Sequence, residues 1–104
     1  MSQSEKVAVI AKLTANPGQR AELAEAVQSA IAAVTEEAGT ECYILHEDAA
    51  DENLLWMYEL YTDQAALSAH GSSDALKAMG MASRPFAAGR PEIIFLKPLA
   101  GKGL

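Results

Sequence analysis

The chain has 104 residues and a net charge of −6, from 14 acidic and 8 basic side chains. Half of its residues are hydrophobic, which is typical of a globular protein, and the length predicts one domain, residues 1–104, with a modest core. The acidic balance and the lack of a basic cluster argue against binding to nucleic acid or to a membrane surface, since both favour a positively charged partner.

The cysteine content and the first residues of the chain bear on the compartment. Cys42 is the only cysteine, which excludes an intrachain disulfide, and it lies in an apolar stretch typical of a small buried side chain. No stretch approaches the length of a membrane span. Residues 1–13 place an acid before the first base and have no long apolar core, unlike a signal peptide. We therefore expect a cytoplasmic protein.

The first half of the chain predicts a strand, a long helix and a second strand. Residues 7–13 (VAVIAKL) are rich in Val and Ile and stop at a turn, as a strand does. Asn16 is a suitable helix cap with Pro17 at the first helical position, and apolar residues then recur every three or four positions. Gly39 is expected to end this helix. Residues 40–46 (TECYILH) are expected to form the next strand.

The second half predicts a strand, a helical region and a last strand. Residues 54–61 (LLWMYELY) follow the previous strand after a short acidic loop, so the two strands are expected to pair as a hairpin. A capping residue at 62–63 begins the helical region, which is expected to break at residues 71–73 and to end at Pro85. The last strand is expected over residues 92–99.

The order β-α-β-β-α-β predicts a ferredoxin-like α+β fold, in which both helical segments cover one face of a four-stranded antiparallel sheet. A strand with one face in water should alternate apolar and polar residues, but residues 54–61 are largely apolar on both faces. Trp56 and Tyr58 point one way, whereas Met57 and Glu59 point the other. A monomer would leave a large apolar patch in water, so we expect a homodimer that packs sheet against sheet.

One motif spans the end of this strand and the start of the next helix. It consists of an acid on the strand (Glu59), an aromatic residue (Tyr61), a helix cap (Asp63), an Ala-Leu pair and a histidine (His70). In this motif the sequence resembles the antibiotic biosynthesis monooxygenase family, which includes small quinol monooxygenases. The resemblance covers nearly the whole chain and extends to Pro17-Gly18, Gly39 and the ending Lys97-Pro98-Leu99.

The resemblance implies a ferredoxin-like subunit that forms a dimeric α+β barrel. Enzymes that it resembles oxidise phenols or quinols with molecular oxygen, many of them without metal or flavin, because an ionised, electron-rich aromatic ring can itself pass an electron to oxygen. It therefore implies a monooxygenase for a small aromatic phenol or quinol, with no cofactor and no metal. Such an enzyme needs an apolar pocket, a proton acceptor and donors that hold an oxyanion.

The catalytic candidates are His70 and Glu59, and each has a structural alternative. His70 is a candidate base because imidazole titrates near neutrality; the alternative is a helix-end histidine that donates to a backbone carbonyl. Glu59 would orient His70 or perturb its titration; the alternative is a hydrogen-bonded structural acid, since a buried carboxylate needs a partner. We expect both residues to approach one cavity, with Tyr61 or an arginine completing its polar part.

The substrate-binding candidates are aromatic, apolar and cationic. Trp56 and Tyr58 share a strand face and would form a flat wall for an aromatic substrate, or simply belong to the core. Tyr61 would donate to a phenolate or fill space between helix and sheet. Met57 suits an adaptable apolar lining. Arg84 would hold an oxyanion at a pocket mouth, or be solvated at the surface.

The sequence also departs from the family pattern. Relatives often carry a second histidine soon after the first, but His70 is followed by Gly-Ser-Ser-Asp, which disfavours a mechanism that needs two imidazoles. Two histidines and one cysteine without ligand spacing argue against a metal site. The alternatives are a non-catalytic dimer that binds or senses an apolar metabolite, and a haem-degrading or isomerase relative on the same fold.

Overall fold

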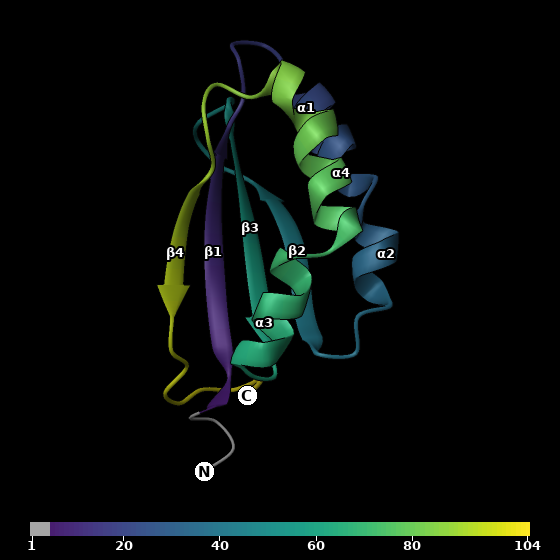
Figure 1. Ribbon diagram of the computed structural model, residues 1–104. Helices are drawn as coiled ribbons and strands as arrows, with labels where there is room; N and C mark the ends of the chain where they lie inside the picture. The colour runs from purple at the N-terminus through teal and green to yellow at the C-terminus, as the bar shows by residue number, and fades with distance from the viewer. Residues whose placement is uncertain (1–4) are drawn as a thin grey trace.

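The computed structural model describes residues 5–104, and in it four strands form one antiparallel sheet with the helices on one face (Figure 1). The elements in chain order are β1 (Val7–Thr14), α1 (Arg20–Gln28), α2 (Ile31–Thr35), β2 (Thr40–Glu47), β3 (Leu54–Tyr61), α3 (Gln64–Gly71), α4 (Asp74–Ser83), the 3-10 turn η2 (Arg84–Phe86) and β4 (Glu92–Leu96). The sheet order is β2-β3-β1-β4. The predicted ferredoxin-like α+β class is confirmed, with each predicted helical segment divided in two.

The strands begin at the predicted residues and differ only at their ends. β2 and β3 pair antiparallel as the predicted hairpin. β4 ends at Leu96, three residues before the predicted end at position 99. Pro98 lacks the N–H that a further ladder hydrogen bond requires, which accounts for the early end.

The predicted helix start at Asn16 is wrong, because residues 16–19 form a tight turn instead. The Gln19 N–H donates to the Asn16 carbonyl at 2.9 Å. Gly18 has a φ of +78°, which suits the third position of a type II turn, and Pro17 takes the second position. The Asn16 side-chain amide donates to the Gln19 side chain and to the Pro85 carbonyl, so it joins this turn to η2.

The single long helix predicted before Gly39 is also wrong, because the helix breaks after Gln28. The Ser29 hydroxyl donates to the Ala26 carbonyl at 2.6 Å, a local bond that competes with the helical ladder. The Ala30 N–H then bonds the carbonyl three residues back, at Val27. Four members of the predicted apolar stripe are buried, namely Leu23, Val27, Ala30 and Val34. The other two differ, since Ile31 is half-buried and Ala38 is exposed.

Gly39 has a different function from the predicted helix stop. α2 ends at Thr35, and Gly39 does not have the positive φ that a glycine cap adopts. Its hydrogen side chain instead allows α3 to approach, because a Cβ at this position would overlap with the Cβ of Ala66. The Thr62 N–H donates to the Gly39 carbonyl at 2.9 Å, which joins the end of β3 to the same corner.

The second helical region follows the prediction. The Asp63 carboxylate caps α3 by accepting from the Ala66 N–H at 2.8 Å. The helix breaks after Gly71, and the Ser73 hydroxyl caps α4 by accepting from the Leu76 N–H. α4 ends two residues before Pro85. No helix within residues 5–104 is long and apolar enough to cross a membrane.

The register of the strands gives each face of the sheet its own set of residues, since directly paired antiparallel residues share a face. One row on the helix-covered face runs across all four strands as Tyr43, Glu59, Val9 and Phe95. The adjacent row on the helix-free face consists of Ile44, Tyr58, Ile10 and Ile94. Polar groups such as Glu59 and Tyr43 and the apolar row that contains Tyr58 are thus on opposite faces of the sheet.

We predict that Gly39→Ala lowers the free energy of unfolding by about 1–3 kcal/mol, because the added methyl overpacks against Ala66 on α3. Urea denaturation measures the change. The control is Gly80→Ala in the middle of α4, where an added Cβ meets nothing within 4 Å. That variant should gain about 0.5–1 kcal/mol, since alanine favours the helix. Equal stability of the Gly39→Ala variant and the wild type would contradict the close approach.

Candidate active site

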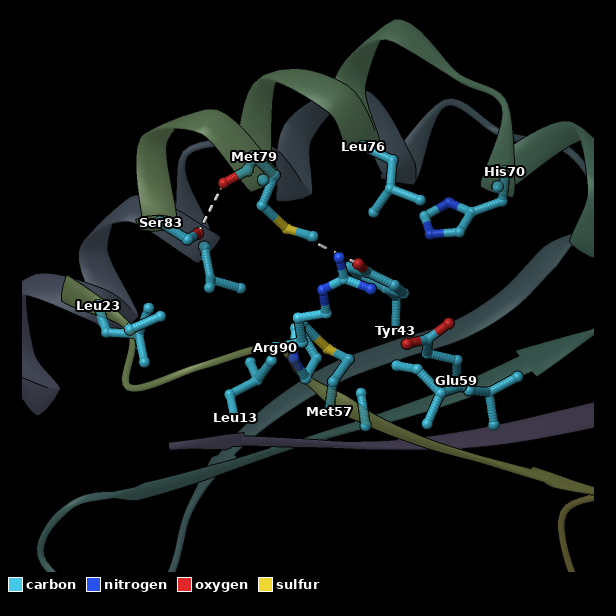
Figure 2. A pocket seen from close by; sticks show the side chains of 18 of the residues that line it. Leu13, Leu23, Tyr43, Met57, Glu59, His70, Leu76, Met79, Ser83 and Arg90 are labelled. Atoms are coloured by element: carbon cyan, nitrogen blue, oxygen red, sulfur yellow. Dashed lines mark hydrogen bonds between the residues drawn. The ribbon is translucent and has the colours of Figure 1, made fainter. Parts of the chain in front are cut away.

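A cavity of about 680 Å³ lies between the helix-covered face of the sheet and helices α3 and α4 (Figure 2). This volume is within the range of small-molecule sites. Most of the lining is apolar, including Val9, Leu13 and Met57 from the sheet and Leu76 and Met79 from α4. The side chains with polar groups in the lining are Tyr43, Glu59, His70, Ser83, Arg84 and Arg90.

His70 reaches the cavity from the last turn of α3, and its side chain is only 4% exposed. Its Nδ1 lies 2.9 Å from Oε1 of Glu37, a residue in the turn after α2 that does not line this cavity. The ring packs between Tyr43 and Tyr61, at centroid distances of 5.1 and 5.4 Å. Because Glu37 occupies one edge of the imidazole, the opposite edge, with Nε2, is the one that faces the cavity (Figure 2).

Glu59 lies in the same cavity lining but is not hydrogen-bonded to His70. Its carboxylate accepts from the Tyr61 hydroxyl at 2.6 Å, and the residue is buried. The carboxylate that bonds His70 is therefore Glu37, which corrects the expectation that Glu59 orients the imidazole. Burial raises the pKa of Glu59, and the Glu37 charge acts in the same direction, while the Tyr61 hydroxyl and nearby His70 oppose the rise.

The two tyrosines beside His70 differ in their access to the cavity. Tyr43 lines it, and its hydroxyl contacts only the weakly accepting sulfur of Met79, at 3.9 Å, among the described residues. Tyr61 is fully buried, lies outside the lining and donates to Glu59. Burial raises the pKa of both tyrosines well above the usual value, and the charge of Glu59 adds to the rise. Both hydroxyls therefore stay protonated and act as donors.

Arg84 and Arg90 are the cationic residues of the cavity lining, and both are exposed to solvent. Arg84 begins η2, and Arg90 precedes β4 with its side chain extending into the cavity (Figure 2). Neither forms an ion pair with any residue in the part of the chain that the structure describes. Their guanidinium groups are thus available to an oxyanion of a ligand.

Trp56 and Tyr58 lie on the helix-free face, so the sheet separates them from the cavity. The Trp56 indole N–H donates to the Asp48 carboxylate at 2.8 Å, and the Lys12 ammonium lies 5.8 Å from the ring centroid. The aromatic wall expected from these two residues therefore does not line this cavity within one chain. Met57, their neighbour on β3, does line it.

The sequence interpretation missed two residues next to His70. Tyr43 lies between Cys42 and Ile44 on β2, so the alternation of a strand predicts that it faces the other way from these two residues. Its position opposite Glu59 depends on the register in which β2 and β3 pair. Glu37 belongs to a run of acidic residues at a helix end, and no local pattern distinguishes it from exposed Glu36. Only the docking of α3 brings His70 to it.

Metal-ligating side chains do not gather in this part of the molecule. Within residues 5–104, no three histidine, cysteine or acidic side chains are placed so that they would hold a metal ion.

The chain is thus a small α+β protein with a ferredoxin-like sheet, an apolar cavity under its helices and one buried histidine that faces this cavity. The family is given by sequence: the model of the antibiotic biosynthesis monooxygenases matches residues 6–80, and the chain belongs to this family. No functionally curated protein matches the chain.

Solved structures agree with this assignment. The chain is similar to a Caulobacter crescentus protein described as a candidate antibiotic biosynthesis monooxygenase, with 31% identity, 95% and 94% of the two chains covered and a TM-score of 0.86. The protein PA3566 from Pseudomonas aeruginosa has 30% identity, with 94% and 98% covered and a TM-score of 0.83. Rv0793 from Mycobacterium tuberculosis has 26% identity, with 94% and 99% covered and a TM-score of 0.85.

We predict that Glu59→Gln becomes more stable relative to the wild type as the pH rises. A raised pKa means that the folded protein binds the Glu59 proton more tightly than the unfolded chain does. The wild type therefore loses stability as the pH rises from the ordinary glutamate value through the raised one, whereas glutamine does not titrate. Denaturant unfolding at about pH 4 and about pH 8 measures the difference between the two proteins.

The control for this experiment is Glu41→Gln. The hydrogen bond from Lys6 lowers the pKa of Glu41, which lies at the surface. Its contribution to stability is therefore present at the higher pH and lost as the pH falls, so the sign of the trend is opposite and its size is small. A parallel pH dependence of Glu59→Gln and the wild type would show that the Glu59 carboxyl is not destabilised by burial.

Proposed function

We propose that this protein is a cofactor-independent monooxygenase that oxidises a small phenol or quinol with molecular oxygen. The observation that carries the proposal is the imidazole of His70, which is buried and faces an apolar cavity of about 680 Å³. Membership of the antibiotic biosynthesis monooxygenase family supports the reaction class. The apolar lining favours an aromatic substrate, because it offers few hydrogen bonds to a polar one.

The reaction balances without a further reductant. A phenol with a free para position and O₂ give a para-quinone and water: one oxygen atom enters the ring, the other leaves as water, and the substrate supplies all four electrons. The step that the protein must assist is removal of the phenolic proton, because the phenolate passes an electron to oxygen far more readily than the phenol. His70 is the base, with Nε2 accepting the proton.

The phenolate oxygen then needs donors. Tyr43 keeps its proton and lines the cavity, and Arg84 and Arg90 place positive charge there. Charge-assisted bonds of this kind stabilise an oxyanion more in an apolar cavity than in water. The ionised form of Glu59 attracts the imidazolium that forms, whereas burial raises the pKa of this carboxyl. Trp56 and Tyr58 have no part in this arrangement within one chain.

The same proposal includes a homodimer, since proteins of this family are commonly dimeric. The helix-free face carries the apolar row Ile44, Tyr58, Ile10 and Ile94, and both edge residues of the row are about half exposed, at 49% and 48%. Such a face is costly in water. Packing two of these sheets together buries it and produces the dimeric α+β barrel expected from the sequence.

We predict that His70→Asn lowers oxygen-dependent turnover of a phenol on the order of a hundredfold, the usual scale for a lost general base. The asparagine amide keeps a donor near Glu37 but has no group that accepts a proton. Oxygen uptake per folded protein measures turnover, and ¹⁸O₂ should place one labelled atom in the quinone. The control is His46→Asn, because His46 lies on the opposite face of the sheet and does not line the cavity. Unchanged uptake by His70→Asn, or ligand binding by the wild type without any uptake, would contradict the proposal.

We predict that Tyr58→Asp converts the dimer into a monomer, because it places a charge at the centre of the apolar row. Sedimentation velocity at micromolar concentration measures the change. The control is Met81→Asp, which changes an apolar side chain that is 71% exposed on α4, away from the sheet, and should remain dimeric. A wild type that sediments as a monomer would refute the dimer without affecting the interpretation of the cavity.

A further inference from the structure

We infer that Glu37 is a positioning residue that sets the tautomer of His70, so that the nitrogen facing the cavity is the one that accepts the substrate proton. The inference rests on the proposed oxidation of a phenol and adds a residue that does not touch the substrate. Glu37 lies outside the lining of the cavity, on the far side of the imidazole ring. It acts only through His70.

The hydrogen bond between the two side chains determines where the proton is. An ionised carboxylate is an acceptor only, so a contact of 2.9 Å between Glu37 Oε1 and His70 Nδ1 requires a proton on Nδ1. A neutral imidazole has one N–H, and the lone pair is then on Nε2. Without Glu37 the neutral imidazole could carry its proton on either nitrogen. The tautomer with the proton on Nε2 has no lone pair there and cannot accept a proton from a substrate in the cavity.

Glu37 is itself held in place by the start of β2. The Thr40 hydroxyl donates to the same Oε1 at 2.7 Å, and the Thr40 N–H donates to the Glu37 carbonyl. A register shift between Thr40 and Cys42 puts Thr40 opposite Tyr61 and Tyr43 opposite Glu59. Because of this bulge, Thr40 and Tyr43 both lie near His70. Thr40 bonds Glu37, which bonds His70, and the Tyr43 ring contacts the His70 ring directly.

The proton step is then defined atom by atom. The phenolic O–H bond breaks, an N–H bond forms at Nε2, and the products are a phenolate and an imidazolium. The ionisable groups around the ring are Glu37 from the turn after α2, Tyr43 from β2, and Glu59 and Tyr61 from β3. The tyrosines stay neutral, and Glu37 is the carboxylate in direct contact with the imidazolium.

The first experiment reads the tautomer directly and does not depend on activity. In protein labelled with ¹⁵N-histidine, long-range ¹H–¹⁵N correlations at a pH where His70 is neutral should show the proton on Nδ1. Glu37→Gln should reduce the population of this tautomer, because an amide can either accept from Nδ1 or donate to it. The control is Glu36→Gln, its exposed neighbour, which should match the wild type. A proton on Nε2 in the wild type would overturn the inference.

The second experiment measures kinetics on a phenol. Glu37→Gln should lower kcat by roughly tenfold to a hundredfold with little change in KM, since the substrate does not touch Glu37. The acidic limb of the pH–rate profile should move to lower pH, because the imidazolium has lost a neighbouring anion. A general loss of structure would not shift this limb in the remaining active protein. An unshifted limb with unchanged kcat would overturn the inference.

The two experiments separate the inference from the function on which it rests. Absence of phenol oxidation in the wild type, together with a proton on Nδ1 that depends on Glu37, would refute the oxidation and support the positioning. Oxidation that depends on His70 but not on Glu37 would support the oxidation and refute the positioning.

Discussion

The site depends on one close approach between a helix and a turn. Gly39 has no side chain, so Ala66 of α3 packs directly against it, and the Thr62 N–H bonds its carbonyl. This contact places the α3 helix against the turn that carries Glu37. His70 is one turn beyond Ala66 on the same helix, and its ring consequently meets the Glu37 carboxylate. A larger residue at position 39 would move the helix and separate the pair.

The sheet contributes to the same site through its period of two. Met57 and Glu59 face the helices, whereas Trp56 and Tyr58 face away, and a slip of one residue in register would exchange the two sets. The two faces of β3 therefore contribute to different parts of the molecule. One face supplies a buried carboxylate beside an apolar cavity, and the other presents an apolar surface that the helices leave uncovered.

Burial gives the polar groups of the cavity their chemical character. Glu59 and the two tyrosines would be ordinary surface groups in water, but beside an apolar lining burial raises the pKa of each of them. The tyrosines therefore remain donors. The Tyr61 hydroxyl donates to the Glu59 carboxylate and His70 lies nearby, and both oppose the rise in the pKa of Glu59. Glu59, Tyr43 and Tyr61 together therefore set the electrostatic surroundings of the His70 imidazole.

The sequence by itself determined the strands, the ferredoxin-like order, a helix cap at residues 62–63, a helix break at residues 71–73 and the two faces of β3, because these follow from spacing within short segments. It also pointed to His70 and Glu59 as residues of one cavity. Only the tertiary structure decided that Glu37 bonds His70, since partners 33 residues apart are brought together by helix docking. The break at Ser29 and the role of Gly39 were likewise decided by packing, which a spacing pattern does not contain.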